Sequence, residues 1–173
     1  MIKFVVAVVV ACATLAIPRL ATADDAYRVS LNGYGPVKFG MTHVEAQRAL
    51  GVKLVDEQPD PDYPNCTFLS PAAGHTGVSF MLLRGHIARV DVSERAIATV
   101  SGARVGDSKA SILSLYAGHI LVTPHYYTAP EGSYFTMLSS NQRRGLRFET
   151  DADKVTMFYA GTKEAVQFVE GCL

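Results

Sequence analysis

Two similar stretches, 66 residues apart, constrain this sequence more than any other feature. Gly35 to Gly51 has the sequence GPVKFGMTHVEAQRALG, and Ala103 to Gly118 has the sequence ARVGDSKASILSLYAG. In each stretch a glycine stands two positions before a hydroxyl residue, Thr42 or Ser108, and such residues are favoured at helix N-caps. The duplication predicts two related structural units.

A second block supports the duplication by its spacing, although chance matching of glycines and aliphatic residues is the alternative. One block of residues recurs 66 positions later in the sequence; it comprises Gly40, Thr42 and Ala46. The other block recurs 68 positions later; it comprises Gly77, Val78, Phe80, Ile87 and Val90.

Each stretch predicts a helix of about two turns. Thr42 and Glu45 form a capping box, in which each side chain satisfies a backbone donor of the other residue. Gly51 follows as the C-terminal cap. The second helix is predicted to start at Ser108 and to end before Gly118. Isolated helices of this length are marginal, so both should need packing against a larger element.

Alternating apolar residues after each helix predict β-hairpins. Residues 78–83 and 87–92 flank a turn at Gly85, and residues 145–148 and 155–159 flank the second turn. In the first hairpin Arg89 and Asp91 alternate with Val90, which predicts one solvent-exposed face. Residues 52–73 are rich in proline and are predicted to be irregular.

The sequence therefore predicts an α+β fold. Two related helix-plus-hairpin units, residues 24–100 and 101–173, would form a shared antiparallel sheet with short helices on one face. A unit of about 66 residues would be only marginally stable by itself, so the two units are expected to form one compact domain.

The N-terminus has the three parts of a secretory signal peptide. Lys3 supplies the positive charge, an apolar run extends from Phe4 to Ile17, and Ala21-Thr22-Ala23 is a small-residue cleavage site. This run is shorter than the ~20 residues of a transmembrane helix, which predicts that the protein does not span a membrane. We expect cleavage near Ala23 and a periplasmic or secreted protein; a lipid anchor on Cys12 is the alternative.

The charge of the mature chain excludes some partners. Loss of Lys3 and Arg19 leaves 14 basic and 16 acidic residues. Because nucleic-acid binding requires a basic surface, no nucleic-acid partner is expected. The two remaining cysteines, Cys66 and Cys172, are predicted to form a disulfide, as is usual for an even pair in an oxidising compartment.

The element Gly-Met-Thr-x-x-Glu-Ala-x-x-Ala-Leu-Gly at Gly40 to Gly51, followed by a hairpin, resembles the repeat of the BamE/SmpA outer-membrane assembly lipoproteins. Its tandem use in an exported chain is similar to that in β-lactamase inhibitor protein. The resemblance spans residues 35–160 and implies a non-enzymatic module whose sheet face or loops contact another macromolecule.

Candidate binding residues cluster after the second helix. Exposed tyrosines offer large, rigid contact surfaces with a polar tip, and arginines can pair with carboxylates or phosphates. The candidates are His125, Tyr126, Tyr127, Tyr134, Arg143 and Arg144. The alternative is that Tyr126 and Tyr134 are half-buried strand residues.

No motif predicts a catalytic nucleophile, a metal site or a cofactor. The five histidines lack metal-ligand spacing, and no Gly-x-Ser-x-Gly element is present. We therefore expect a binding or inhibitory module whose partner is another protein or an envelope glycan. The alternative is an envelope enzyme or small-ligand binder that uses His125, Tyr126 and Tyr127.

Overall fold

The computed structural model describes residues 26–57 and 64–172. The predicted signal peptide, residues 1–23, and the alternative lipid-anchor site Cys12 lie outside the described residues.

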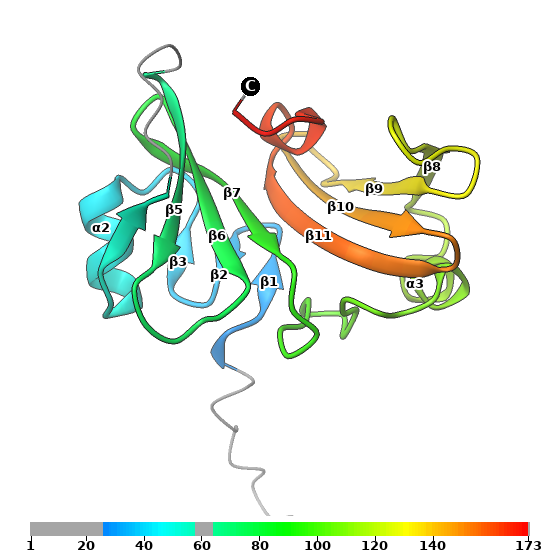
Figure 1. Cartoon of the computed structure of the whole chain (residues 1–173), viewed down its shortest axis with the longest axis horizontal. Helices are drawn as coiled ribbons and strands as arrows, with labels where there is room; N and C mark the ends of the chain where they lie inside the picture. The colour runs from blue at the N-terminus through cyan, green and yellow to red at the C-terminus, as the bar shows by residue number, and fades with distance from the viewer. Residues whose placement is uncertain (1–25, 58–63, 173) are drawn as a thin grey trace, which may run out of the picture.

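Strands make up most of the regular structure (Figure 1). The strands are β1 (Val29–Ser30), β2 (Gly33–Tyr34), β3 (Val37–Lys38), β4 (Leu54–Asp56), β5 (Cys66–Pro71), β6 (Val78–Leu83), β7 (His86–Val92), β8 (Leu121–Pro124), β9 (Ser133–Leu138), β10 (Arg144–Asp151) and β11 (Lys154–Thr162). The helices are α2 (His43–Leu50), α3 (Lys109–Leu115) and the 3-10 helix η1 (Ala165–Gln167).

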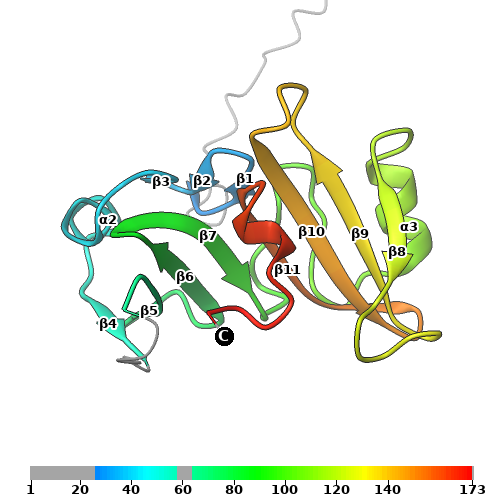
Figure 2. The same ribbon diagram turned by 90° about the horizontal axis from the view of Figure 1, so that it is seen from above.

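Eight strands form one antiparallel sheet in the order β4-β5-β6-β7-β11-β10-β9-β8. The strands β1, β2 and β3 form a separate small sheet. The large sheet is continuous because β7 and β11 pair at its centre, with register from Arg89 opposite Gly161 to Val92 opposite Phe158. Figure 2 shows β4, β5, β6 and β7 on one side of this junction and β8, β9, β10 and β11 on the other.

The predicted α+β class is wrong, because the fold is β-rich. Among the described residues the two α-helices have only 8 and 7 residues. Both begin where the sequence predicted, since Thr42 and Glu45 form the capping box and Ser108 accepts from the backbone N–H of Ser111. Each ends after about two turns, so helices cover little of a sheet this wide.

The predicted irregular segment contributes two strands, so that prediction is also wrong. The strands β4 and β5 pair from Leu54 opposite Pro71 to Asp56 opposite Leu69. The described prolines of this segment, Pro64 and Pro71, lie before β5 and at its last residue. At these positions a missing N–H disturbs few ladder hydrogen bonds.

The two halves share one local arrangement that joins the entry of each helix to the sheet. The N–H of Gly40 donates to the carbonyl of Ile87, and the N–H of Gly106 donates to the carbonyl of Val155. Both glycines have positive φ, 96° and 85°, a conformation that other residues rarely adopt. The turn before each helix is thereby attached to a central strand.

One face of the large sheet is covered by α2, α3 and the small sheet. Apolar residues from all of these elements pack together into the main core, which includes the buried Phe80, Phe148 and Phe158. Burial of this surface from water is the main stabilising contribution to the fold.

The C-terminal arm, which we define as residues 163–172, packs on the opposite face over β7, β10 and β11. Figure 1 shows the arm on the opposite side of β7 and β11 from β1. Ala165 and Val166 are fully buried there. The prediction that Arg89 and Asp91 face solvent is therefore wrong, since their exposed fractions are 4% and 8%.

Two glycines in the central strands permit close packing, Gly145 against the arm and Gly161 against the neighbouring strand β7. Gly145 and Gly161 are opposite one another on β10 and β11. A Cβ on Gly145 would lie 2.7 Å from Cγ2 of Val166, and one on Gly161 would lie 2.4 Å from the carbonyl oxygen of Ala88. Glycine within a strand often marks such a close approach.

The disulfide between Cys66 on β5 and Cys172 fastens the end of the arm. This confirms the predicted pairing and is consistent with an oxidising compartment. In residues 26–57 and 64–172, neither α-helix has the length and apolar character needed to cross a bilayer.

Replacing both cysteines with serine (C66S/C172S) should lower the free energy of unfolding by about 2–5 kcal/mol, because the disulfide closes a loop with a sequence separation of 106. Urea unfolding measures this loss. Hydrogen exchange should show faster exchange of the arm amides, whereas those of β10 stay protected. Two alkylatable thiols in the native exported protein would contradict the pairing.

Candidate binding site

The tyrosine loop, which we define as residues 125–132, connects β8 to β9 beside the arm. Backbone hydrogen bonds close it on itself: the N–H of His125 donates to Gly132 (3.1 Å), and that of Gly132 donates to Thr128 (2.8 Å). A Cβ on Gly132 would lie 2.8 Å from the carbonyl oxygen of Thr150, so only glycine fits there. The loop therefore has a defined shape.

His125 anchors this loop through both of its ring nitrogens. Nδ1 lies 3.2 Å from the backbone nitrogens of Tyr127 and Thr128, which donate to it. Because Nδ1 is the acceptor, Nε2 carries the proton and donates to Oε2 of Glu149 at 3.2 Å. The His125 ring also stacks on Tyr134, with centroids 4.4 Å apart.

The Glu149 carboxylate connects the loop to the centre of the sheet. Its second oxygen, Oε1, accepts from the hydroxyl of Tyr159 at 2.9 Å. Burial of Tyr159 raises the pKa of its phenol, and the Glu149 charge raises it further. Tyr159 therefore remains a protonated donor at neutral pH.

Tyr134 is held from two sides. Burial raises the pKa of the Tyr134 phenol. The guanidinium carbon of Arg147 lies 4.9 Å from the Tyr134 ring centroid, and Nε of Arg147 donates to Thr136 at 2.9 Å. The exposed fraction of Tyr134 is 5%, so it supports the loop and presents little contact surface.

Tyr126 and Tyr127 are the exposed members of the loop. Their exposed fractions are 73% and 58%, and their rings meet edge to face at 4.8 Å. The Tyr127 hydroxyl donates to Oε1 of Glu170 in the arm. This hydrogen bond raises the pKa of Tyr127 to about 12.

Arg89, on β7, binds the arm to the large sheet. Its Nε and Nη2 donate to the two oxygens of Asp91 at 2.7 and 2.8 Å. Its Nη1 donates to the carbonyls of Ala165 (2.9 Å) and Phe168 (3.3 Å). The guanidinium carbon lies 4.4 Å from the Tyr159 ring centroid. All of its donor nitrogens are thus used.

The Arg89–Asp91 pair is taken out of water almost completely. Burial raises the pKa of Asp91, and the Arg89 charge and hydrogen bonds counteract that effect. Among the described residues, no buried side-chain nitrogen or oxygen lacks a hydrogen-bond partner. The polar network under the arm is therefore fully satisfied, as a buried network must be to be tolerated.

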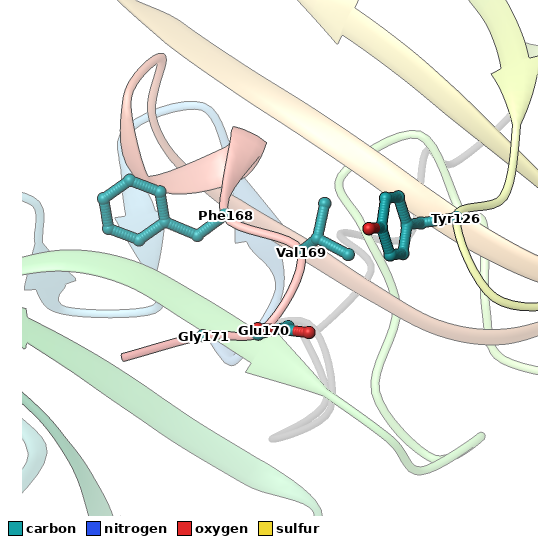
Figure 3. Close-up of a pocket in the computed structure, with 5 residues that line it drawn as sticks. All are labelled: Tyr126, Phe168, Val169, Glu170 and Gly171. Carbon is teal, nitrogen blue, oxygen red and sulfur yellow. The ribbon is translucent and has the colours of Figure 1, made fainter. Parts of the chain in front are cut away.

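The surface has one hollow beside the arm and another over the first half of the large sheet. The first, which we call the Tyr126 hollow, has a volume of about 350 Å³ and is lined by Tyr126, Phe168, Val169, Glu170 and Gly171 (Figure 3). The second, of about 440 Å³, lies over β5, β6 and β7 and includes Phe68, Ser79, Asp91 and Met157. Both fall within the usual size range of ligand pockets.

The structure brings four of the six candidate residues together. His125, Tyr126, Tyr127 and Tyr134 form the loop and its support. Arg143 lies in the turn between β9 and β10, and Arg144, the first residue of β10, stacks on Phe39 at 5.2 Å. The loop lies at the other end of β10, where Thr150 pairs with Ser133, about 20 Å away along the strand.

Sequence reasoning missed the arm and the residues beneath it. The alternation of Arg89 and Asp91 with Val90 predicts a solvent-exposed face, but in the folded protein the arm lies over these two residues. The predicted Cys66–Cys172 disulfide was the available signal, since it required the C-terminal residues to reach β5.

Replacing Arg89 with methionine should lower the free energy of unfolding by about 3–5 kcal/mol, because it leaves the buried Asp91 carboxylate without its partner. The double variant R89M/D91L should cost less than R89M, and urea unfolding of both measures the coupling. The matched control is R84M: Arg84 pairs with Glu164 at the surface, so its loss should cost at most about 1 kcal/mol. Equal losses in R84M and R89M would contradict this account.

Alkaline pH should release Tyr127 from Glu170. The pKa of Tyr127 is raised from 10.0 to about 12 in the folded protein, so the contact contributes fully below pH 10 and is lost as pH rises through 12. Carbon-13 NMR of the tyrosine Cζ atoms follows the titration. The substitution Glu170→Gln should move the Tyr127 midpoint back toward 10, and an unchanged midpoint would contradict the assignment.

Comparison with known proteins identifies no family. No protein-family model matches this sequence, and a search of curated proteins gives no match. Among solved structures, the crystal structure of the uncharacterized protein yfeY from Escherichia coli is similar, with a TM-score of 0.49 and 15% sequence identity. The match covers 78% of this chain and 99% of that chain. No functional residue is transferred from it.

Proposed function

We propose that this protein is an exported, non-enzymatic binding module that contacts another envelope or secreted macromolecule through the tyrosine loop and the C-terminal arm. The predicted signal peptide supports export, and the disulfide is consistent with an oxidising compartment. The resemblance of the Gly-Met-Thr element to the BamE/SmpA repeat favours the same class of protein.

The observation that carries the proposal is the exposure of Tyr126 and Tyr127 on a loop that His125 holds in place. Tyrosines are enriched among the residues that contribute most to binding at interfaces. Because the loop is already fixed by hydrogen bonds to Nδ1 of His125, little conformational entropy remains to be lost on binding. Such preorganisation is expected of a recognition surface.

The exposed apolar surface continues from the loop into β8. Leu121 and Val122 have exposed fractions of 66% and 46%, and β8 is the edge strand of the large sheet. An apolar edge strand beside exposed tyrosines extends the area available to a partner. Pro124 in this edge strand has no N–H to donate, which limits indiscriminate strand pairing.

The arrangement around His125 favours binding over catalysis. A general base needs a ring nitrogen with a free lone pair within reach of the substrate. Nδ1 of His125 is occupied by two backbone N–H groups, and Nε2 donates to Glu149. The histidine thus supports the loop, which weighs against the alternative of an enzyme that uses it.

A pull-down from envelope extract of the source organism tests the proposal, with the protein lacking the predicted signal peptide (residues 24–173) as bait. The double variant Y126S/Y127S should lose the captured partner by at least about 30-fold, the effect of losing an interface hot spot of ~2 kcal/mol.

The matched control is V44S/V100S, which removes two apolar side chains with exposed fractions of 59% and 63% outside the loop. It should capture the same partner as the wild type. Equal capture by the wild type and Y126S/Y127S would contradict the proposal, as would turnover of a substrate that depends on His125.

A further inference from the structure

We infer that the Tyr126 hollow binds an arginine side chain of the partner. This inference rests on the proposed function and specifies what the site recognises. It follows from the chemistry of the walls, from the charge of Glu170 and from a similar arrangement inside the same protein.

The walls of the hollow combine an aromatic ring with an aliphatic side chain. Figure 3 shows the Tyr126 ring and the Val169 methyl groups facing one another, with the Glu170 side chain lower in the same opening. Tyr126 and Val169 are both exposed, at 73% and 38%, so a side chain of another protein can enter from solvent. A long side chain with an apolar stem and a polar end matches these walls.

The charge at the hollow is negative and unpaired. Oε1 of Glu170 accepts from the Tyr127 hydroxyl, and the described residues provide no hydrogen bond to Oε2. In the described parts of the chain, arginines pair with Asp91, Asp107 and Glu164, and no basic side chain pairs with Glu170. A cationic group from a partner could form an ion pair with this carboxylate.

Arginine fits this combination better than lysine or a neutral group. A guanidinium is planar, stacks on aromatic rings, is weakly hydrated and donates several hydrogen bonds to a carboxylate. A lysine ammonium is a compact, strongly hydrated charge that stacks less well. A neutral apolar ligand would leave the free oxygen of Glu170 without a partner.

The interior of the protein contains the same combination. Arg89 stacks on Tyr159 at 4.4 Å while its nitrogens donate to a carboxylate, that of Asp91. The Tyr126 hollow supplies the ring of Tyr126 and the carboxylate of Glu170, and an arginine of the partner would supply the guanidinium.

The hollow is held in shape before binding. The disulfide at Cys172 fixes the arm next to Gly171, Arg89 binds the carbonyl of Phe168, and Tyr127 binds Glu170. An arginine therefore meets a wall that is already positioned, which lowers the entropic cost of binding.

The test is an NMR titration of the disulfide-bonded protein (residues 24–173) with N-acetyl-L-arginine amide. The Val169 methyl and Tyr126 ring signals should shift saturably. N-acetyl-L-citrulline amide, which has nearly the same shape without the charge, should bind up to about fivefold more weakly, as a single exposed charge pair allows. N-acetyl-L-lysine amide should also bind more weakly than the arginine probe.

Three variants identify the groups responsible. Glu170→Gln should reduce arginine binding to the level of citrulline. Tyr127→Phe removes the hydrogen bond that positions Glu170 and leaves the carboxylate in place, so it should weaken arginine binding less than Glu170→Gln does. Glu131→Gln removes another exposed carboxylate of the tyrosine loop that does not line the hollow, and should leave binding unchanged.

Several results would overturn the inference. These are an absence of shifts at Tyr126 and Val169, equal binding of arginine and citrulline, tighter binding of lysine, or retained binding in Glu170→Gln. If the arginine probe fails while capture of the partner still requires Tyr126 and Tyr127, only the inference is lost. If the probe binds while capture is independent of the tyrosines, the proposed interface is wrong and the arginine site remains.

Discussion

The buried pair of Arg89 and Asp91 is the interaction on which the binding surface depends. The guanidinium uses two nitrogens on the carboxylate and a third on the carbonyls of the arm. The arm covers this pair, and Arg89 in turn holds the arm through the carbonyls of Ala165 and Phe168. Loss of either would remove one wall of the Tyr126 hollow.

The central pairing of β7 with β11 gives this arrangement its two faces. Apolar side chains on one face pack into the main core, while Arg89, Asp91 and Tyr159 occupy the other. A sheet face that carries charges normally contacts water. Here Gly145 leaves space for Val166 of the arm, and the disulfide keeps the arm in place. The polar face thereby becomes the base of a recognition surface.

Local sequence signals predicted the elements that depend on neighbouring residues. Thr42, Glu45 and Gly51 define α2 because capping involves residues within one turn. Both hairpins also follow from local alternation and turn residues. The prediction of an α+β fold was wrong because it underestimated how much of the chain joins the large sheet. For example, β4 and β5 lie in a proline-rich segment that was predicted to be irregular. Strand pairing involves distant residues, so composition was a poor guide there.

The sequence by itself determined the helix starts, the hairpins, the disulfide and the tyrosine-rich loop. Only the tertiary structure decided that Arg143 and Arg144 lie away from this loop and that Glu170 reaches it. The register of β10 places the arginines at one end of the strand and the loop at the other. Glu170 is 43 residues from Tyr127, and their contact depends on the path of the arm across the sheet. No local pattern encodes such a path, because it results from burial, the ion pair and the disulfide acting together.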